Sequence, residues 1–485
     1  MIHAVKLQLL KSLYIICLAP LLASCATYRA EPISPADNGI ALDSRTLNDA
    51  RLTSFIHGAL RTGATSDETV PWGLGTLTLA AIYYHPDIDV ARAKLAASRA
   101  SVITAGQRPN PTLNFSGVFG TAAIVGGIPP AAIPATIGPV VNFLVETFGK
   151  RQARTEQAQN LAEAARWDIA TAGWQVRARV RTGLLNLWAA QKGLSLTRQR
   201  LQLQQQLVGL LESRFANGEA SALDVTRERI NRAQAELSIR TFERTAAEAR
   251  AQAAAAVGVP LRAMDGVKVS VEAFDHPGAV AAGISTGALR QKALTGRTDV
   301  LASLSDYAAN QSALQLQVAN QYPNLTLGPG YNYDIGVNKF ILNSAIDFPI
   351  FNQNQGQIAQ AIANRQQAAA TFTALQAQII GAIDAAVASY DGATRSLATA
   401  DALLATEQRR QREVTSSFQA GNADRPTLVT TQLELAVIQT SRLDAVVAQR
   451  QALGALEDAL QQPIFDPGDT PSVPSTNPRM TAERY

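Results

Sequence analysis

Residues 180–215 read VRTGLLNLWAAQKGLSLTRQRLQLQQQLVGLLESRF, and an apolar side chain stands at every seventh position of this stretch. The six positions are Val180, Leu187, Leu194, Leu201, Val208 and Phe215. A sustained seven-residue repeat keeps one stripe of a helix against a partner helix, as in a coiled coil. No proline lies between Pro139 and Pro260. We therefore predict one very long helix over about residues 149–216, roughly 100 Å long at ~1.5 Å per residue.

The same pattern occurs a second time, 203 residues further along the chain. Five of the six positions are again apolar, namely Ile383, Tyr390, Leu397, Leu404 and Phe418, with Gln411 as the exception. The same offset pairs Phe148 with Phe351, Gly218 with Gly421, and Pro260 with Pro463. Further upstream an offset of 212 pairs Asp87 with Asp299 and Pro111 with Pro323. These matches indicate an internal duplication, with repeat 1 at residues 75–260 and repeat 2 at 287–463.

Each copy predicts the same series of elements. A helix leads to a proline-marked break and two extended segments, and a very long helix, a glycine-containing turn and a second long helix follow. The expected helices lie at about 75–107, 149–216 and 222–257 in the first copy and at 287–320, 352–419 and 427–461 in the second. The fold class is therefore mainly α with a small β portion, built on duplicated long coiled-coil helical hairpins.

The extended segments alternate between apolar and polar residues. In residues 340–348, FILNSAIDF, one face carries Phe, Leu, Ser, Ile and Phe, and the other carries Ile, Asn, Ala and Asp. The first copy alternates in the same way around Leu113 and Phe115 and around Val141 and Phe143. This pattern suits strands of a membrane barrel, and locally it suits a hairpin on a soluble core equally well.

Four such strands do not close a barrel, because about eight are the practical minimum and lipid does not tolerate open strand edges. If these strands enter a membrane, the chain must therefore oligomerise. Residues 120–139 between the first two strands are apolar and rich in proline. We expect an external loop there, and its hydrophobicity has no explanation in the sequence.

The first 24 residues form a predicted signal peptide. Lys6 and Lys11 precede an apolar segment from Leu13 to Leu22, which is too short to span a membrane. Leu22-Ala23-Ser24-Cys25 resembles the bacterial lipobox, in which the cysteine receives a diacylglycerol and an N-acyl chain such as palmitate. An ordinary signal cleaved near Ser24 is the alternative. Residues 25–74 would then be a lipid-anchored tether, and the proline-rich residues 464–485 a loose tail.

Composition argues against several classes of function. Of 485 residues, 43 are basic and 39 acidic, so the net charge of 43 − 39 = +4 makes no nucleic-acid-binding face. Residues 283–287, GISTG, match a hydrolase nucleophile motif, but the last histidine, His276, precedes the serine, whereas that fold needs it afterwards. No metal-binding histidine or cysteine cluster and no phosphate-binding loop is present in the sequence. We predict no enzyme activity, no metal and no cofactor apart from lipid on Cys25. No apolar run long enough for a transmembrane helix follows the signal.

Lipobox, duplicated units and the turn FANGEASALDV at 215–225 together resemble the TolC-like outer-membrane efflux factor family, in its lipoprotein type found in tripartite RND efflux systems. The resemblance covers roughly residues 70–463. It implies a homotrimer in which four strands per chain close a twelve-stranded transmembrane β-barrel, prolonged by an α-helical tunnel in the periplasm. It also implies a periplasmic adaptor and an inner-membrane transporter as partners, and passive conduction of the substrate to the exterior.

The resemblance places the two helix-turn-helix tips at the periplasmic aperture. Candidate aperture residues are Glu219 and Asp224 in the first tip, and Phe418, Asp424 and Arg425 in the second. Family members often carry acidic residues where this chain has Thr427 and Thr430, so the gate of relatives does not transfer directly. Solvated turn charges are the alternative. For the whole protein, a duct for type I protein secretion and a non-conducting coiled-coil scaffold in the envelope also remain open.

Overall fold

The computed structural model describes residues 28–60, 72–118, 136–271, 274–275, 286–334 and 337–464. The chain forms two compact units, residues 1–45 and 46–485. The first contains α2 (Pro35–Asp43), which begins after Ser34, whose side chain accepts a hydrogen bond from the Asp37 amide. The predicted signal peptide, Cys25, residues 119–135 of the predicted loop and the tail beyond residue 464 lie outside the described residues.

The second unit contains one antiparallel sheet in the order β1-β2-β3-β4. Its strands are β1 (Thr112–Val118), β2 (Thr136–Val145), β3 (Leu325–Asp334) and β4 (Val337–Ile346). The boundary predicted for the external loop was wrong, because β2 begins at Thr136 and includes Pro139, which lies opposite Phe115. Proline fits an extended strand at the cost of one ladder hydrogen bond, so its presence did not mark the end of the loop.

The long helices predicted from the heptads are confirmed. They are α6 (Lys150–Ala216), α7 (Ala222–Val257), α10 (Gln355–Gln419) and α11 (Arg425–Leu460). A short 3₁₀ turn, η1 (Leu261–Met264), follows α7. The shorter α3 (Ala50–Leu60) was not foreseen, and it buries Leu52 and Ile56 in the main core.

The helices expected at 75–107 and 287–320 are each divided in two. The first consists of α4 (Leu74–Tyr84) and α5 (Pro86–Gly106), and the second of α8 (Thr286–Gly296) and α9 (Thr298–Ala319). His85 is extended, with ψ of 127°, because Pro86 disfavours a helical residue before it. Arg297 is extended in the same way, with ψ of 141°. His85-Pro86-Asp87 thus ends α4 and starts α5.

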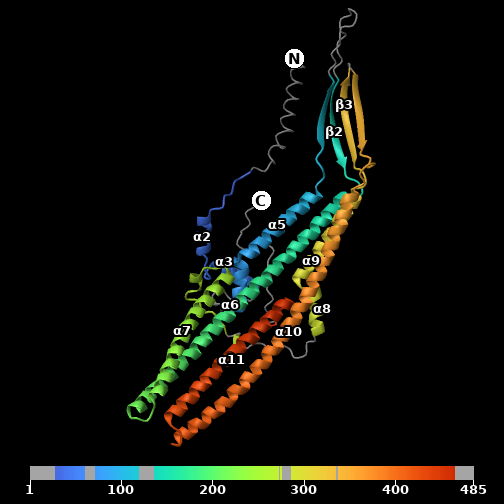
Figure 1. The fold of residues 1–485 in the computed structure, drawn as a ribbon. Coiled ribbons are helices and arrows are strands. Elements are labelled where there is room, and N and C mark those ends of the chain that lie inside the picture. The colour runs from blue at the N-terminus through green and yellow to red at the C-terminus, as the bar shows by residue number, and fades with distance from the viewer. Residues whose placement is uncertain are drawn as a thin grey trace, which may run out of the picture. The chain divides into compact units, whose positions relative to one another are not determined.

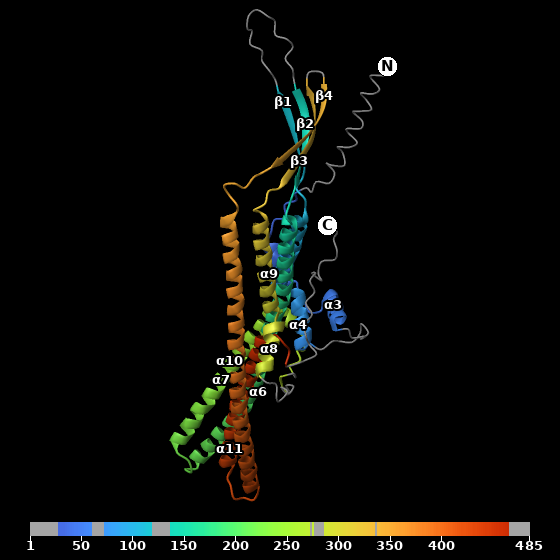
Figure 2. The same ribbon diagram turned by 90° about the vertical axis from the view of Figure 1, so that its right-hand side faces the viewer.

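Every strand continues into a helix: α5 leads into β1, β2 into α6, α9 into β3 and β4 into α10. The helices pack side by side in the same order as the strands, α5-α6-α9-α10 (Figure 1). Farther from the sheet, α7 packs on α6, and α11 packs on both α10 and α6 (Figure 2). The second unit is therefore a wall, one strand or helix thick near the sheet, that ends in two helical hairpins.

The largest hydrophobic core lies where α4, α6, α7 and α11 meet. Ten of the eleven residues of α4 are buried there, among them Leu77, Ile82 and Tyr83. Val180 and Leu184 of α6 face this core, together with Leu453 of α11. Burial of so much apolar surface fixes α4 on α6 and α7 of the first copy, and α11 of the second copy joins the same core through its contact with α6.

The expectation that no helix is long and apolar enough to span a membrane meets one exception among the described residues. An 18-residue window of α10 has a mean hydropathy of 1.3, and only 17% of that window is buried. The window belongs to a 65-residue helix that packs on α9 and α11 along its length. The described part of one chain leaves most of this apolar window uncovered, and an exposed apolar surface of this kind marks a site of interaction.

Candidate functional site

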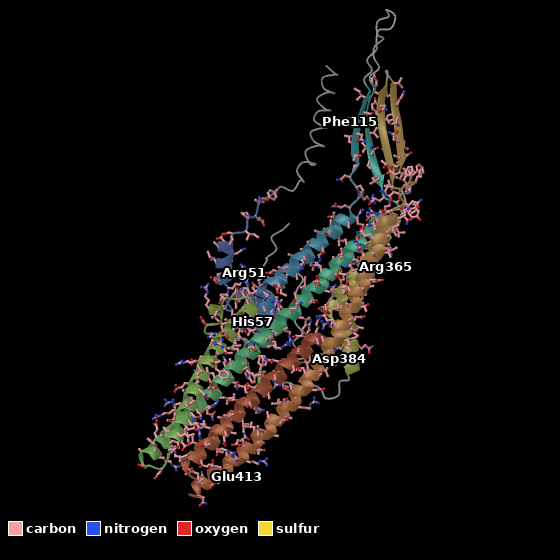
Figure 3. The ribbon with its side chains drawn as sticks, viewed as in Figure 1. Arg51, His57, Phe115, Arg365, Asp384 and Glu413 are labelled. Atoms are coloured by element: carbon pink, nitrogen blue, oxygen red, sulfur yellow. The ribbon has the colours of Figure 1, made fainter. Side chains whose placement is uncertain are left out.

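The two faces of the sheet differ in chemistry, as the alternation predicted. Pairing of the strands puts Phe115 beside Pro139 and Tyr331 beside Phe340 on one face, and Asn142 beside Thr112 on the other. The register extends the apolar face over all four strands, to Leu113, Val141, Phe143, Leu327 and Leu342. Phe115 lies on the part of the sheet that projects beyond the helices (Figure 3).

Glycines on the polar face show which way the sheet curves. A Cβ at Gly138 would lie 1.8 Å from Oδ1 of Asn332, and a Cβ at Gly328 would lie 2.3 Å from Oδ1 of Asn142. Val140, on the same face, is only 8% exposed although none of the described helices or strands forms a second layer on the sheet. Side chains converge on the concave side of a curved sheet, so glycine is needed there. The polar face is therefore the concave one.

Neither face nor edge of the sheet is covered by the described part of the chain. Its strands pack on one another, while Phe340 is 87% exposed, Phe115 72% and Leu342 71%. Strands β1 and β4 each have one hydrogen-bonded neighbour. The interpretation of the strands as a hairpin packed on a soluble core is therefore wrong, because no described helix or strand forms a core beneath them.

A network of polar contacts fixes the sheet to the helices. The Lys150 ammonium at the start of α6 donates to the carbonyl oxygen of Tyr322 at 2.6 Å and to Oδ1 of Asn324 at 2.8 Å. Phe148, just before α6, has a positive φ of 55° and stacks on Tyr322 with ring centroids 4.1 Å apart. Positive φ is strained for a large side chain, so this connection is held in place by its surroundings.

A buried ionic cluster joins the two copies farther along α6. Arg177 and Arg181 donate to the same Glu457 oxygen on α11, at 3.0 and 2.8 Å, and Arg181 also donates to Asp458 at 2.7 Å. The Arg177 and Glu457 side chains are 0% exposed. Removing one partner of a buried ion pair typically costs about 3–5 kcal/mol, so the cluster fixes α11 against α6.

The tips of the two hairpins have equivalent caps. Gly218 and Gly421 have φ of 77° and 78° at the turns, which favours glycine. Ser221 caps α7 by accepting from the Asp224 amide at 3.1 Å, and Asp424 caps α11 by accepting from the Thr427 amide at 2.9 Å. The offset of 203 therefore pairs Asp424 with Ser221 rather than with Asp224.

An ion pair connects the two tips. Arg214, in the last turn of α6, lies with its Nη2 3.0 Å from Oδ2 of Asp424. Hydrogen bonds from the Thr427 hydroxyl and amide, followed by the contact with Arg214, hold the pKa of Asp424 below its ordinary value, although partial burial acts in the opposite direction. Asp424 therefore acts as a helix cap and as the anchor of the neighbouring hairpin.

No hydrogen bond or ion pair among the described residues joins the side chains of the other predicted aperture residues. Asp224 accepts from the Ser221 hydroxyl at 2.6 Å, while the backbone N–H of Glu219 donates to the Arg214 carbonyl at 2.8 Å. Phe418 is 36% exposed, and Arg425 is exposed and has no ion-pair partner among the described residues. The sequence analysis did not identify Arg214. The available signal was that Arg214 stands next to the heptad residue Phe215, whereas the equivalent position in the second copy, Ser417, carries no charge.

Comparison with known proteins gives one consistent family. The family described as outer membrane efflux protein matches residues 80–259. Pyoverdine export outer membrane protein OpmQ of Pseudomonas aeruginosa is 25% identical over 411 residues, covering 80% of this chain and 84% of OpmQ. Cobalt-zinc-cadmium resistance protein CzcC of Cupriavidus metallidurans is 29% identical over 230 residues, covering 47% of this chain and 53% of CzcC.

Solved structures share the fold. The outer membrane protein VceC of Vibrio cholerae has a TM-score of 0.64 at 20% identity, covering 80% of this chain and 95% of VceC. The outer-membrane channel OprN has a TM-score of 0.64 at 17% identity, covering 91% of this chain and 99% of OprN.

A four-strand sheet prolonged by a wall of long helices is the fold that this chain shares with the solved outer-membrane proteins VceC and OprN. The chain is similar to the TolC-like outer membrane efflux proteins, with the family match confined to residues 80–259, and its place is the outer membrane, with a large helical portion in the periplasm.

Proposed function

We propose that the protein is the outer-membrane channel of a tripartite efflux system. Three copies close a twelve-stranded barrel, and their helices form a periplasmic tunnel. A periplasmic adaptor and an inner-membrane transporter deliver substrate to the tunnel, and the channel conducts it passively to the exterior. The energy for transport comes from the transporter, and this chain carries out no catalysis.

One observation carries the proposal. In the described part of the chain, the wall of strands and helices has two free lateral edges, and the apolar face of its sheet is uncovered. β1 and β4 present unpaired edges, and lipid does not tolerate unpaired backbone groups. α5 and α10 continue those edges, and the apolar window of α10 is mostly exposed. A ring of copies satisfies every one of these surfaces, and the concave polar face then lines the pore.

Cysteines introduced at the two edges test this arrangement. We expect Ser116→Cys on β1 combined with Asn343→Cys on β4 to be joined between copies by a short thiol-reactive cross-linker, giving dimer and trimer bands on a denaturing gel. Ser116→Cys alone is the matched control and should give no trimer. Exclusively monomeric protein, together with absent conductance in planar bilayers, would contradict the proposal and favour the non-conducting scaffold.

We infer that the two tips form the periplasmic aperture. The Arg214–Asp424 pair supports this because it ties the hairpins of one chain together, so loosening it would let the tips move apart. Glu219, Asp224, Phe418 and Arg425 are the further residues proposed to face the aperture. Charged rings filter ions and hold pores closed by mutual contacts.

We propose that Cys25 is acylated and anchors the N-terminus in the outer membrane. The support is the sequence Leu22-Ala23-Ser24-Cys25 after a signal-like segment. Mass spectrometry of the mature N-terminal peptide should show a diacylglycerol and an N-acyl chain on Cys25. An unmodified cysteine, or an N-terminus at another residue, would contradict it.

The substrate class is left to the transporter in this proposal. OpmQ is named for pyoverdine export and CzcC for cobalt, zinc and cadmium resistance, so similar channels serve chemically different substrates. Deleting the gene should therefore abolish resistance or export in every efflux system that uses this channel. A type I protein secretion duct would instead show loss of a secreted protein from the medium.

A further inference from the structure

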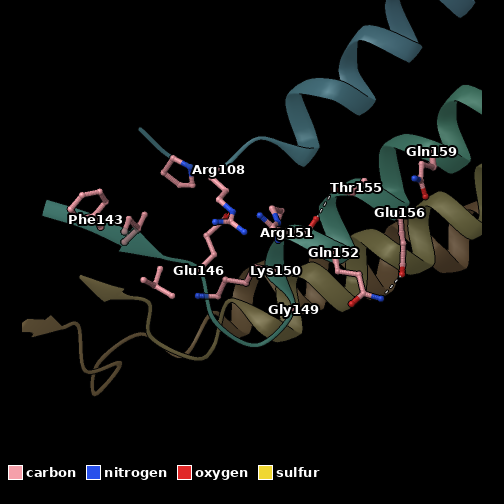
Figure 4. A pocket seen from close by; sticks show the side chains of 13 residues that line it. Arg108, Phe143, Glu146, Gly149, Lys150, Arg151, Gln152, Thr155, Glu156 and Gln159 are labelled. Atoms are coloured by element: carbon pink, nitrogen blue, oxygen red, sulfur yellow. Dashed lines mark hydrogen bonds between the residues drawn. The ribbon is translucent and has the colours of Figure 1, made fainter. Parts of the chain in front are cut away.

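A hollow of about 780 Å³ lies where β2 meets α6 (Figure 4). Phe143 and Val145 of the apolar sheet face line one side of it. Arg108, from the connection between α5 and β1, and Arg151, in the first turn of α6, line the other. The hollow therefore joins the apolar surface of the strands to a cationic surface on the helices.

Among the described residues that line the hollow, the cations Arg108, Lys150 and Arg151 exceed the carboxylates Glu146 and Glu156 by one charge. Arg154 engages Glu146 through two hydrogen bonds of 2.7 and 3.2 Å. Glu156, the other acidic residue of the lining, accepts a side-chain amide at 2.8 Å. Arg108 and Arg151 have no acidic partner within the described part of the chain. Two guanidinium groups thus remain available to an external anion.

The duplication shows that the fold does not require these cations. The second copy has Asn320 at the position equivalent to Arg108, by the offset of 212, and Asn354 at the position equivalent to Arg151, by the offset of 203. Both copies keep the order helix, strand, strand and long helix, although four residues join β2 to α6 and eight join β4 to α10. This order of elements therefore does not depend on the two arginines.

We propose that this hollow binds the headgroup phosphate of an anionic glycerophospholipid in the inner leaflet of the outer membrane. Arg108 and Arg151 hold the phosphate oxygens, and Phe143 and Val145 contact the first part of the acyl chains. A guanidinium fork matches phosphate geometry, and an amphipathic lining matches an amphipathic ligand. The inference rests on the proposed membrane-spanning sheet, since it places the hollow at the membrane surface.

Native mass spectrometry of the detergent-purified protein tests the site, with phosphatidylglycerol, phosphatidylcholine or inorganic phosphate added separately. We expect the wild type to retain phosphatidylglycerol, up to one molecule per chain, in preference to phosphatidylcholine. Arg108→Gln combined with Arg151→Gln should lower retention about tenfold, because two charge-assisted hydrogen-bonding groups are lost. Arg240→Gln with Arg244→Gln, two exposed arginines of α7, is the control with the same charge change and should behave as wild type.

Equal retention by the arginine variant and the wild type would overturn the proposal. Displacement of phosphatidylglycerol by an equal concentration of inorganic phosphate would also overturn it, because the ligand would then be free phosphate. The mass in the same spectrum reports the number of chains. A monomer would refute the proposed channel, whereas a trimer that loses its lipid preference only in the arginine variant supports both.

Discussion

Replacing Asp424 by asparagine should loosen the closed arrangement of the two tips. Asparagine keeps an oxygen at the helix cap, and it caps helices about as well as aspartate. The substitution therefore removes the charge that faces Arg214 while leaving the start of α11 intact. We expect a higher conductance or open probability than in the wild type.

The size of the effect follows from the exposure of the pair. The side chains of Arg214 and Asp424 are 37% and 43% exposed, so solvent screens their attraction. Exposed pairs contribute about 0.2–1 kcal/mol, and ~0.5 kcal/mol is a reasonable value here. If three such pairs break together in the proposed trimer, the sum of about 1.5 kcal/mol shifts the opening equilibrium about tenfold.

The pH dependence of this effect has a definite sign. The ordinary pKa of aspartate is 3.8, and that of Asp424 is lower in the folded protein, so its contribution is present above about pH 4 and lost as the pH falls through the lower value. Wild-type conductance should therefore show no change from this pair between about pH 5 and 8, and should approach the Asp424→Asn level in stronger acid.

Single-channel recording in planar bilayers measures the outcome. Arg214→Gln removes the same ion pair from the other side, so the double variant should add little to either single one. High salt should reduce the difference from the wild type, because it screens exposed charges. Unchanged conductance in Asp424→Asn, or fully additive effects of the two substitutions, would refute the assigned link between the tips.

Three further substitutions test the packing of the helices by thermal unfolding in detergent. Glu457→Gln should destabilise the protein by about 3–5 kcal/mol, because it weakens the buried ion pairs with Arg177 and Arg181. Glu248→Gln, at an exposed position, is the control and should cost under about 1 kcal/mol. Similar losses of stability in the two variants would contradict the role of the cluster. Gly454→Ala should cost about 1–3 kcal/mol, since its Cβ would lie 2.7 Å from Nε of Arg181. Gly209→Ala, with open space around it, should be neutral or stabilising. A greater loss of stability in Gly209→Ala than in Gly454→Ala would contradict the close packing at Gly454. Gln461→Ala should be less stable than Gln461→Gly by about 1 kcal/mol because the residue has φ of 49°, and equal stability would exclude backbone strain there.

The long helices could be predicted because their signals are local. A heptad repeat without proline sets the body of each helix, and a glycine such as Gly218 followed by a cap such as Ser221 sets its end. The prediction failed where one stretch of sequence suited both a loop and a strand. The apolar, proline-rich segment up to Pro139 was expected to be a loop, yet β2 contains Pro139.

The polar contacts between helices could not be predicted in the same way. Arg177 and Glu457 are 280 residues apart, and they meet only because α11 packs on α6. Arg214 likewise finds Asp424 across two hairpins. Heptad spacing tells which face of a helix is buried, but it does not identify the partner helix or its register, so charges at the contact remain unassigned until the packing is known.

The duplication turns such contacts into experiments, because the two copies keep one backbone while their side chains differ. Gly258 and Gln461 are equivalent by the offset of 203, and both have positive φ, of 82° and 49°. Gln461 uses its side chain to accept from the amide and hydroxyl of Thr298, each at 2.8 Å, which a glycine does not do. Asp424 adds a link to Arg214 that its equivalent Ser221 does not make to that residue in the first tip. Replacing a residue by its equivalent therefore preserves the local conformation and deletes one contact, as in Asp424→Ser, which keeps a capping oxygen and removes the tie between the tips.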